Sequence, residues 1–159
     1  MQGVGGNSED FFLRDYAEAV RHFEEAIRED PNFPQAHAAL AVMLIASAGE
    51  IYPYREVIPR VRQLAGRALE LDRGLADAHV ALGNLAMQVD HDWTRAEGEF
   101  REAIVLNPSH SQAHLWYALL LATLQRHEES QEEYSRAIEL DPLWFPPEAA
   151  SRRGRAPLR

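Results

Sequence analysis

The stretch FREAIVLNPSHSQAH, residues 100–114, decides how this chain folds. Its first part has apolar residues at helical spacing, Asn107–Pro108 then ends a helix, and its last part opens a new one. The same passage occurs earlier as FEEAIREDPNFPQAH, residues 23–37, and as AGRALELDRGLADAH, residues 65–79, and a fourth copy, YSRAIELDPLW, covers residues 134–144. The sequence therefore predicts a repeated unit of two helices.

Two series of marker residues define the period of the repeat. They are the alanines near the helix ends, Ala26, Ala68, Ala103 and Ala137, and the histidines that open the next helix, His37, His79 and His114. Each histidine follows its alanine at one constant distance, whereas the distance from a histidine to the next alanine varies and is longest from His37 to Ala68. Stacked repeats cannot change a connection between layers without rotating the stack, but a surface loop within one repeat can grow. We therefore expect fixed connections between repeats and variable ones within them.

Apolar spacing predicts seven helices and an all-α fold of stacked antiparallel helix pairs, with one half repeat before three full repeats. The expected helices cover about 11–28, 35–48, 54–71, 76–88, 93–106, 111–125 and 128–140, with Asp92 as an N-cap. The expected domain spans 11–144, divided into the half repeat 11–33, the repeat 34–75 with an inserted loop at 49–59, and the repeats 76–110 and 111–144. Residues 1–10 are expected to form a disordered or ragged N-terminus, and residues 145–159 a tail rich in proline and arginine.

Composition excludes several classes of function. The net charge of −9 argues against nucleic acid as the main ligand, because nucleic-acid-binding proteins carry a basic footprint. The chain shows no secretory signal and no apolar run of about 20 residues, so we expect a soluble, cytoplasmic protein that does not enter a membrane. Because cysteine is absent, disulfides, thiolate metal sites and cysteine nucleophiles are excluded.

Small, aromatic and proline residues recur at equivalent positions of the repeats. The small residues are Ala41, Gly83 and Ala118 in the first helices and Ala19, Ala96 and Ser130 in the second helices; the late aromatics are Phe23, Phe100 and Tyr134, and the closing prolines are Pro31, Pro108 and Pro142. With this pattern the chain resembles the tetratricopeptide repeat (TPR) family over about residues 16–144. In detail, its residue sequence is most similar to TPR regions of bacterial multidomain regulators. The resemblance implies a right-handed α-solenoid and a non-catalytic protein–protein interaction module.

The resemblance also implies that the first helix of each pair lines a concave groove that binds a peptide or helix of a partner protein. The residues expected to line this groove are Gln35, Val42, Asp77, Val80, Asn84, Met87, Gln112, Trp116, Leu119 and Thr123. Asn84 matches an asparagine that binds the ligand backbone in many TPR proteins, and Met87 and Trp116 are candidate anchors. In an equally weighted alternative, Trp116 packs against a following repeat or the tail.

Other candidate sites have simpler structural interpretations. The three histidines recur one to a repeat, about 10 Å apart, so they cannot share a metal ion and are expected to pack and form one hydrogen bond each. Asp90, His91 and Asp92 lie in a turn, where aspartate usually caps a helix. No nucleophile–base pair or ligand set is evident, so we assign no catalytic, cofactor or metal residue and no enzymatic activity. The alternative function is a structural or oligomerisation element that self-associates through uncapped terminal helices.

Overall fold

The computed structural model describes residues 8–143 and confirms the all-α fold. Its helices are α1 (Ser8–Glu29), α2 (Pro34–Ala46), α3 (Tyr54–Leu71), α4 (Ala76–Leu85), the π-helix η1 (Ala86–Asp90), α5 (Trp93–Leu106), α6 (Ser111–Thr123) and α7 (His127–Leu140). These residues hold no strand beyond an isolated bridge between Ala48 and Tyr52. The tail expected at 145–159 and residues 1–7 of the expected N-terminal segment lie outside the described residues. Residues 8–10 of that segment belong to α1.

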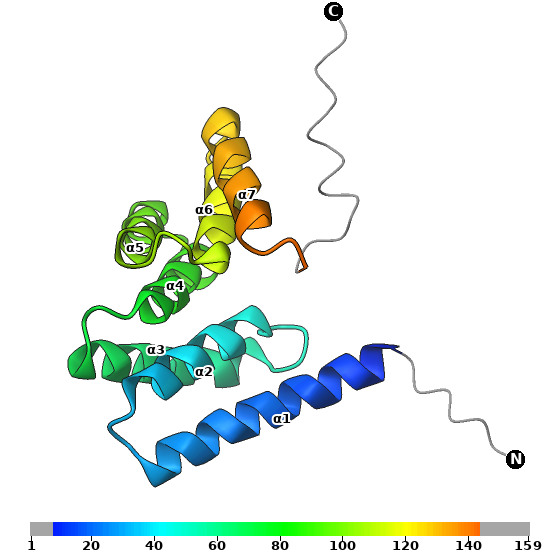
Figure 1. Ribbon diagram of the computed structural model, residues 1–159, viewed down its shortest axis with the longest axis vertical. Coiled ribbons are helices and arrows are strands. Elements are labelled where there is room, and N and C mark those ends of the chain that lie inside the picture. The colour runs from blue at the N-terminus through cyan, green and yellow to red at the C-terminus, as the bar shows by residue number, and fades with distance from the viewer. Residues whose placement is uncertain (1–7, 144–159) are drawn as a thin grey trace, which may run out of the picture.

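The helices form a solenoid in which each pair packs on the next (Figure 1). The pairs are α2–α3, α4–α5 and α6–α7, and α1 has the place of a second helix, with no first helix before it among the described residues. The first helices also pack on each other, α2 on α4 and α4 on α6, while α1, α3 and α5 each contact the first helix that follows. In Figure 1 the pair α2–α3 runs across the view and the pair α6–α7 runs up it, so the layers turn as the stack proceeds.

Small side chains let the two helices of a pair approach closely. Gly83 of α4 lies against the ring of Phe100 of α5, and a Cβ atom on Gly83 would lie 2.6 Å from Cε1 of that ring. Phe100 is fully buried, and so are Ala96 and Ala103 on the same helix. The ring thus occupies the space that a side chain at position 83 would need, because protein interiors leave few voids.

Residues that lengthen the second repeat form both a loop and an additional helical turn. The loop between α2 and α3 turns at Gly49, which has a φ of +87° and donates its amide hydrogen to Tyr52 O at 2.8 Å. Relative to Ala68, helix α3 begins about one turn earlier than α5 and α7 do relative to their equivalent alanines. The inserted loop expected at 49–59 is therefore shorter in the structure, since residues 54–59 belong to α3.

The one extra residue of the third repeat is absorbed by the π-helix. The first helices α4 and α6 begin one position further apart in the chain than the second helices α5 and α7 do. His91 and Gln125, which have the same spacing as the starts of α5 and α7, are the left-handed residues that precede these helices, with φ of 52° and 60°. A π-turn accommodates one more residue than an α-turn, so η1 restores the register before the second helix begins.

We expect Gly83→Ala to destabilise the protein by about 1–3 kcal/mol, because the new methyl group must displace the buried ring of Phe100. The matched control is Gly98→Ala in α5, where nothing lies within 4 Å of the added Cβ, and this change should stabilise the helix by up to about 1 kcal/mol. Urea unfolding followed by circular dichroism measures both changes. Equal effects of the two substitutions would contradict the close approach of α4 and α5.

Candidate protein-binding surface

The ten side chains expected to line the groove all lie on first helices or on η1, but they differ in burial. Three of them, Val42, Val80 and Asn84, are buried, because α2 and α4 pack directly on each other and Val42 and Val80 belong to their common core. Asn84 has no exposed surface: its Nδ2 donates to Val80 O, and its Oδ1 accepts from Gln88 Nε2. The structure therefore differs from the sequence interpretation here, since these three side chains cannot contact a ligand in this conformation.

Asp77 holds two layers together. Its Oδ1 accepts a hydrogen bond from Nε2 of His110 at 2.6 Å, which links the start of α4 to the start of α6. Nδ1 of the same histidine accepts from the amide of Ala113 and so caps α6. These two bonds assign the proton of a neutral ring to Nε2. The half-buried Asp77 therefore already has a structural partner.

The accessible residues of the expected groove lie mostly on α6. Gln112, Trp116, Leu119 and Thr123 follow one another at spacings of three or four positions and thus share one side of this helix, which we name the α6 face. Leu119 is 42% exposed and Thr123 is exposed, while Gln112 and Trp116 are half-buried. On the first two layers, Gln35 is exposed and Met87 is half-buried.

Trp116 is partly packed and partly open, and the core that it packs against belongs to its own and earlier layers, not to a following repeat. Trp116 and Met87 both pack against the core formed around Phe100, Tyr117 and Leu120. Neither side chain is fully covered within the described residues. The packed part fixes the position of the indole ring, and the uncovered part can contact a partner.

A half-buried carboxylate holds α6 against its neighbours. Glu97 of α5 accepts hydrogen bonds from the hydroxyl of Tyr117 at 2.9 Å and from Nη1 of Arg126 at 2.8 Å. Arg126 lowers the pKa of the Glu97 carboxyl, mainly through this hydrogen bond. Burial and the hydrogen bond to Glu97 raise the pKa of Tyr117 to about 12, so this hydroxyl stays protonated as a donor. The α6 face is therefore presented by a helix that is tied to α5 and to the turn before α7.

We name the connection between one layer and the next a seam, and number the seams by the histidine that follows each turn: His37, His79 and His114. These histidines occupy equivalent positions, as predicted. Nε2 of His37 and Nε2 of His114 each lie 2.9 Å from the carbonyl oxygen of the proline six positions earlier, and His79 bonds to the backbone of Arg73, again six positions earlier. Each histidine therefore forms the expected hydrogen bond, and His79 and His114 form a second one, to Glu99 and Glu133. Within residues 8–143 no three side chains of His, Cys, Asp or Glu gather as metal ligands. Asp92 caps α5 by accepting from the amide of Arg95, as expected.

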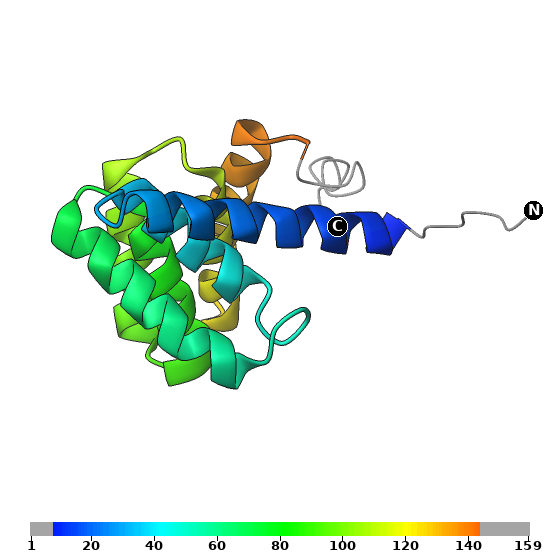
Figure 2. The same ribbon diagram turned by 90° about the horizontal axis from the view of Figure 1, so that it is seen from below.

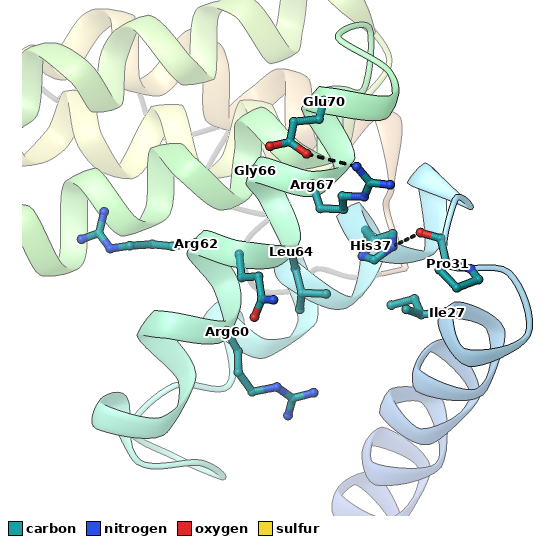
Figure 3. Close-up of a pocket in the computed structure, with 10 residues that line it drawn as sticks. Ile27, Pro31, His37, Arg60, Arg62, Leu64, Gly66, Arg67 and Glu70 are labelled. Atoms are coloured by element: carbon teal, nitrogen blue, oxygen red, sulfur yellow. Dashed lines mark hydrogen bonds and ion pairs between the residues drawn. The ribbon is translucent and has the colours of Figure 1, made fainter.

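The sequence interpretation missed a cavity at the first seam, which lies between α1, the start of α2, and α3 (Figure 3). Its volume is about 710 Å³. We name it the arginine cavity. It is lined by Ile27, Pro31, His37, Arg60, Arg62, Gln63, Leu64, Gly66, Arg67 and Glu70. An alignment of the repeats gives one signal for this site, because Leu64 stands where later repeats have Glu99 and Glu133.

The His79–Glu99 pair should make stability depend on pH. Nδ1 of His79 lies 2.8 Å from Oε2 of Glu99, and this hydrogen bond is the main cause that raises the pKa of His79 above its usual 6.5. A raised pKa in the folded state stabilises the protein fully below the unfolded pKa, and this contribution is lost as pH rises through the folded pKa. We expect Glu99→Gln to flatten the pH dependence of the unfolding free energy as pH rises above about 6.5, the usual pKa of histidine.

The measurement is urea unfolding across this pH range, and the control is Glu50→Gln on the exposed loop after α2, which should keep the wild-type slope. If both variants kept that slope, the His79–Glu99 pair would not be its source. Independently, the side-chain NMR titration of His79 should move to lower pH in the Glu99→Gln variant.

Comparison with known proteins assigns the fold to a family. The tetratricopeptide repeat model matches residues 9–50 and 80–143. TTC0263, a thermophilic TPR protein in Thermus thermophilus, is similar with a TM-score of 0.65 and 16% identity over 89% of this chain and 73% of that one. MamA is similar with a TM-score of 0.54 and 19% identity over 89% of this chain and 77% of that one.

A fragment of MamA from Desulfovibrio magneticus RS-1, residues 41 to the end, has a TM-score of 0.54 and 18% identity over 82% of this chain and 68% of that one. No curated protein sequence matches the chain significantly. None of the helices within residues 8–143 combines the length and the apolar character needed to cross a bilayer. The family model covers more than half of the chain: its first segment contains most of α1 and all of α2, and its second segment runs from within α4 to the end of α7. This chain therefore belongs to the tetratricopeptide repeat family.

Proposed function

We propose that the chain binds an apolar segment of a partner protein, a peptide or a helix, through the α6 face. One observation carries this proposal: Leu119 is 42% exposed beside the half-buried Trp116, although its neighbours Ala118 and Leu120 are buried. Aromatic side chains held in place by packing at the edge of a core are typical interaction hot spots. Repeats of this family are typically non-catalytic, which agrees with a binding role.

Residues of η1 and of the other first helices extend the surface that we propose. Met87 packs on the same core as Trp116 and extends the apolar surface from α6 toward η1. Gln112 and Thr123 flank this surface on α6, and Gln35 is exposed at the start of α2. We therefore place the anchor of the partner at Leu119 and Trp116, with polar contacts at the two ends of the α6 face.

The test is selection of peptides from a displayed library against the full chain, followed by fluorescence anisotropy with the selected peptide. We expect Leu119→Asp to weaken binding tenfold or more, about 1.4 kcal/mol, because it places a charge at the anchor. Val105→Asp is the matched control, since Val105 is a 72% exposed apolar residue on α5, and it should change affinity less than about twofold. Unchanged binding by the Leu119 variant, or a library that yields no enriched peptide, would contradict the proposal.

Self-association through α1 is a second candidate function, favoured by the shape of the solenoid. The N-terminal half of α1 extends beyond the other helices in Figure 2, and no first helix precedes it among the described residues. A helix that lacks a repeat on one side can accept the same surface from a second copy. We expect the mass measured by light scattering to rise over about a hundredfold range of concentration. A constant monomer mass over that range would exclude this function.

A further inference from the structure

The arginine cavity differs from its counterparts at one position of the repeat. In the second seam Nδ1 of His79 lies 2.8 Å from Oε2 of Glu99, and in the third seam Nδ1 of His114 lies 2.5 Å from Oε2 of Glu133. The residue at the same register of the first seam is Leu64, which cannot accept a hydrogen bond. His37 therefore lacks a carboxylate of the kind that bonds to His79 and His114 from the second helix of the same repeat.

His37 is left with an unused hydrogen-bonding atom. The side chain is 7% exposed, its Nε2 bonds to Pro31 O, and its Nδ1 has no hydrogen-bond partner among the described residues. Figure 3 shows the ring in the middle of the cavity lining, with Leu64 alongside it. A buried polar atom without a partner costs free energy, so such an atom in a native protein requires an explanation, and a bound group that satisfies it is one.

The charge of the cavity is also reversed relative to the next layer. Arg67 stands at the register of Glu102, so the two carboxylates of the second seam, Glu99 and Glu102, are replaced by a leucine and an arginine. Arg60 also lines the cavity from the same helix. Arg60 bonds to Glu24 at 2.6 Å, and Arg67 bonds to Asn32 at 2.8 Å and to Glu70 at 3.1 Å.

Each guanidinium has five N–H donors in a planar fork that suits a carboxylate, so these contacts leave further donors on both arginines. A cavity of about 710 Å³ has room for the end of an acidic side chain. Its cationic lining, set beside a histidine without its glutamate, favours an anion in this place.

We propose that the arginine cavity receives the carboxylate of a glutamate side chain from a partner protein. The guanidinium groups of Arg60 and Arg67 donate to the carboxylate, which takes the place that Glu99 and Glu133 occupy in the later seams. Because Nδ1 of His37 is closed to solvent, its bond to the ligand requires a side chain of the lining to rotate away, and we assign this movement to Leu64. The site lies between the second helices α1 and α3, apart from the α6 face, and does not depend on the function proposed for that face.

The test uses the full chain and side-chain NMR signals of its histidine rings and arginine Nε groups. The probe is a capped pentapeptide with one central glutamate between alanines, and its control carries glutamine instead. We expect the glutamate peptide to shift the signals of His37, Arg60 and Arg67 in a saturable way while His79 and His114 stay in place. The proposal is overturned if the glutamine peptide acts equally, if all three histidines shift together, or if inorganic phosphate binds as tightly as the glutamate peptide.

Substitutions within the cavity give a second readout. We expect Arg60→Gln together with Arg67→Gln to weaken binding of the glutamate peptide at least tenfold. Arg136→Gln is the matched control, because Arg136 has the register of Arg67 in the last layer, where Glu133 already bonds to the histidine. Full binding by the double variant would overturn the proposal.

Leu64→Glu should supply the missing carboxylate within the chain. We expect this variant to lose binding of the glutamate peptide and to give His37 ring signals like those of His79. Binding that persists in a folded Leu64→Glu variant would contradict the site, and if this variant does not fold, the arginine variants still decide. Leu119→Asp should bind the glutamate peptide normally, which separates this site from the α6 face.

Discussion

The structure depends on the hydrogen bond that joins each first-helix histidine to the backbone six positions before it. This bond spans the turn between one layer and the next, and it recurs at His37, His79 and His114. A buried ring that must reach one carbonyl oxygen allows little change in the connection, which explains why the distance from each alanine to its histidine is constant. All differences in repeat length are therefore confined to the turns and helix ends within a layer, where the loop after α2 and the π-turn before α5 absorb them.

Because the layers are fixed at these seams, single side chains can change function without changing the fold. The second and third seams are closed by glutamates that bond to their histidines, whereas Leu64 leaves the first seam open to a cavity lined by Arg60 and Arg67. Helix α6, the first helix of the last pair, has the exposed Leu119 beside the packed Trp116. As a member of the TPR family the chain is a protein–protein interaction module in the general sense, and these two regions are the surfaces that we propose for its partners.

Asn84 shows that the position of a residue along a helix does not determine how much of its side chain is exposed to solvent. Its register on α4 agrees with that of a ligand-binding asparagine, but α4 packs against both α2 and α6, and Asn84 is fully buried. The amide group then bonds to Val80 O in α4 and to Gln88 in η1. Leu119 occupies the same register one layer later and is exposed. The burial of equivalent residues is thus set by how many layers cover them.

The sequence alone determined the helix pairs, their order, the constant seams and the family, because apolar periodicity, capping residues and turn-forming residues act over a few neighbouring positions. For that reason α5 was predicted with its correct ends and Asp92 with its correct role. Tertiary structure decided which side chains are buried, where the extra residue of the third repeat is absorbed, and that a cavity lies beside His37. These features depend on contacts between helices far apart in the chain and on the angle at which layers pack, and neither is encoded in the spacing of any one segment.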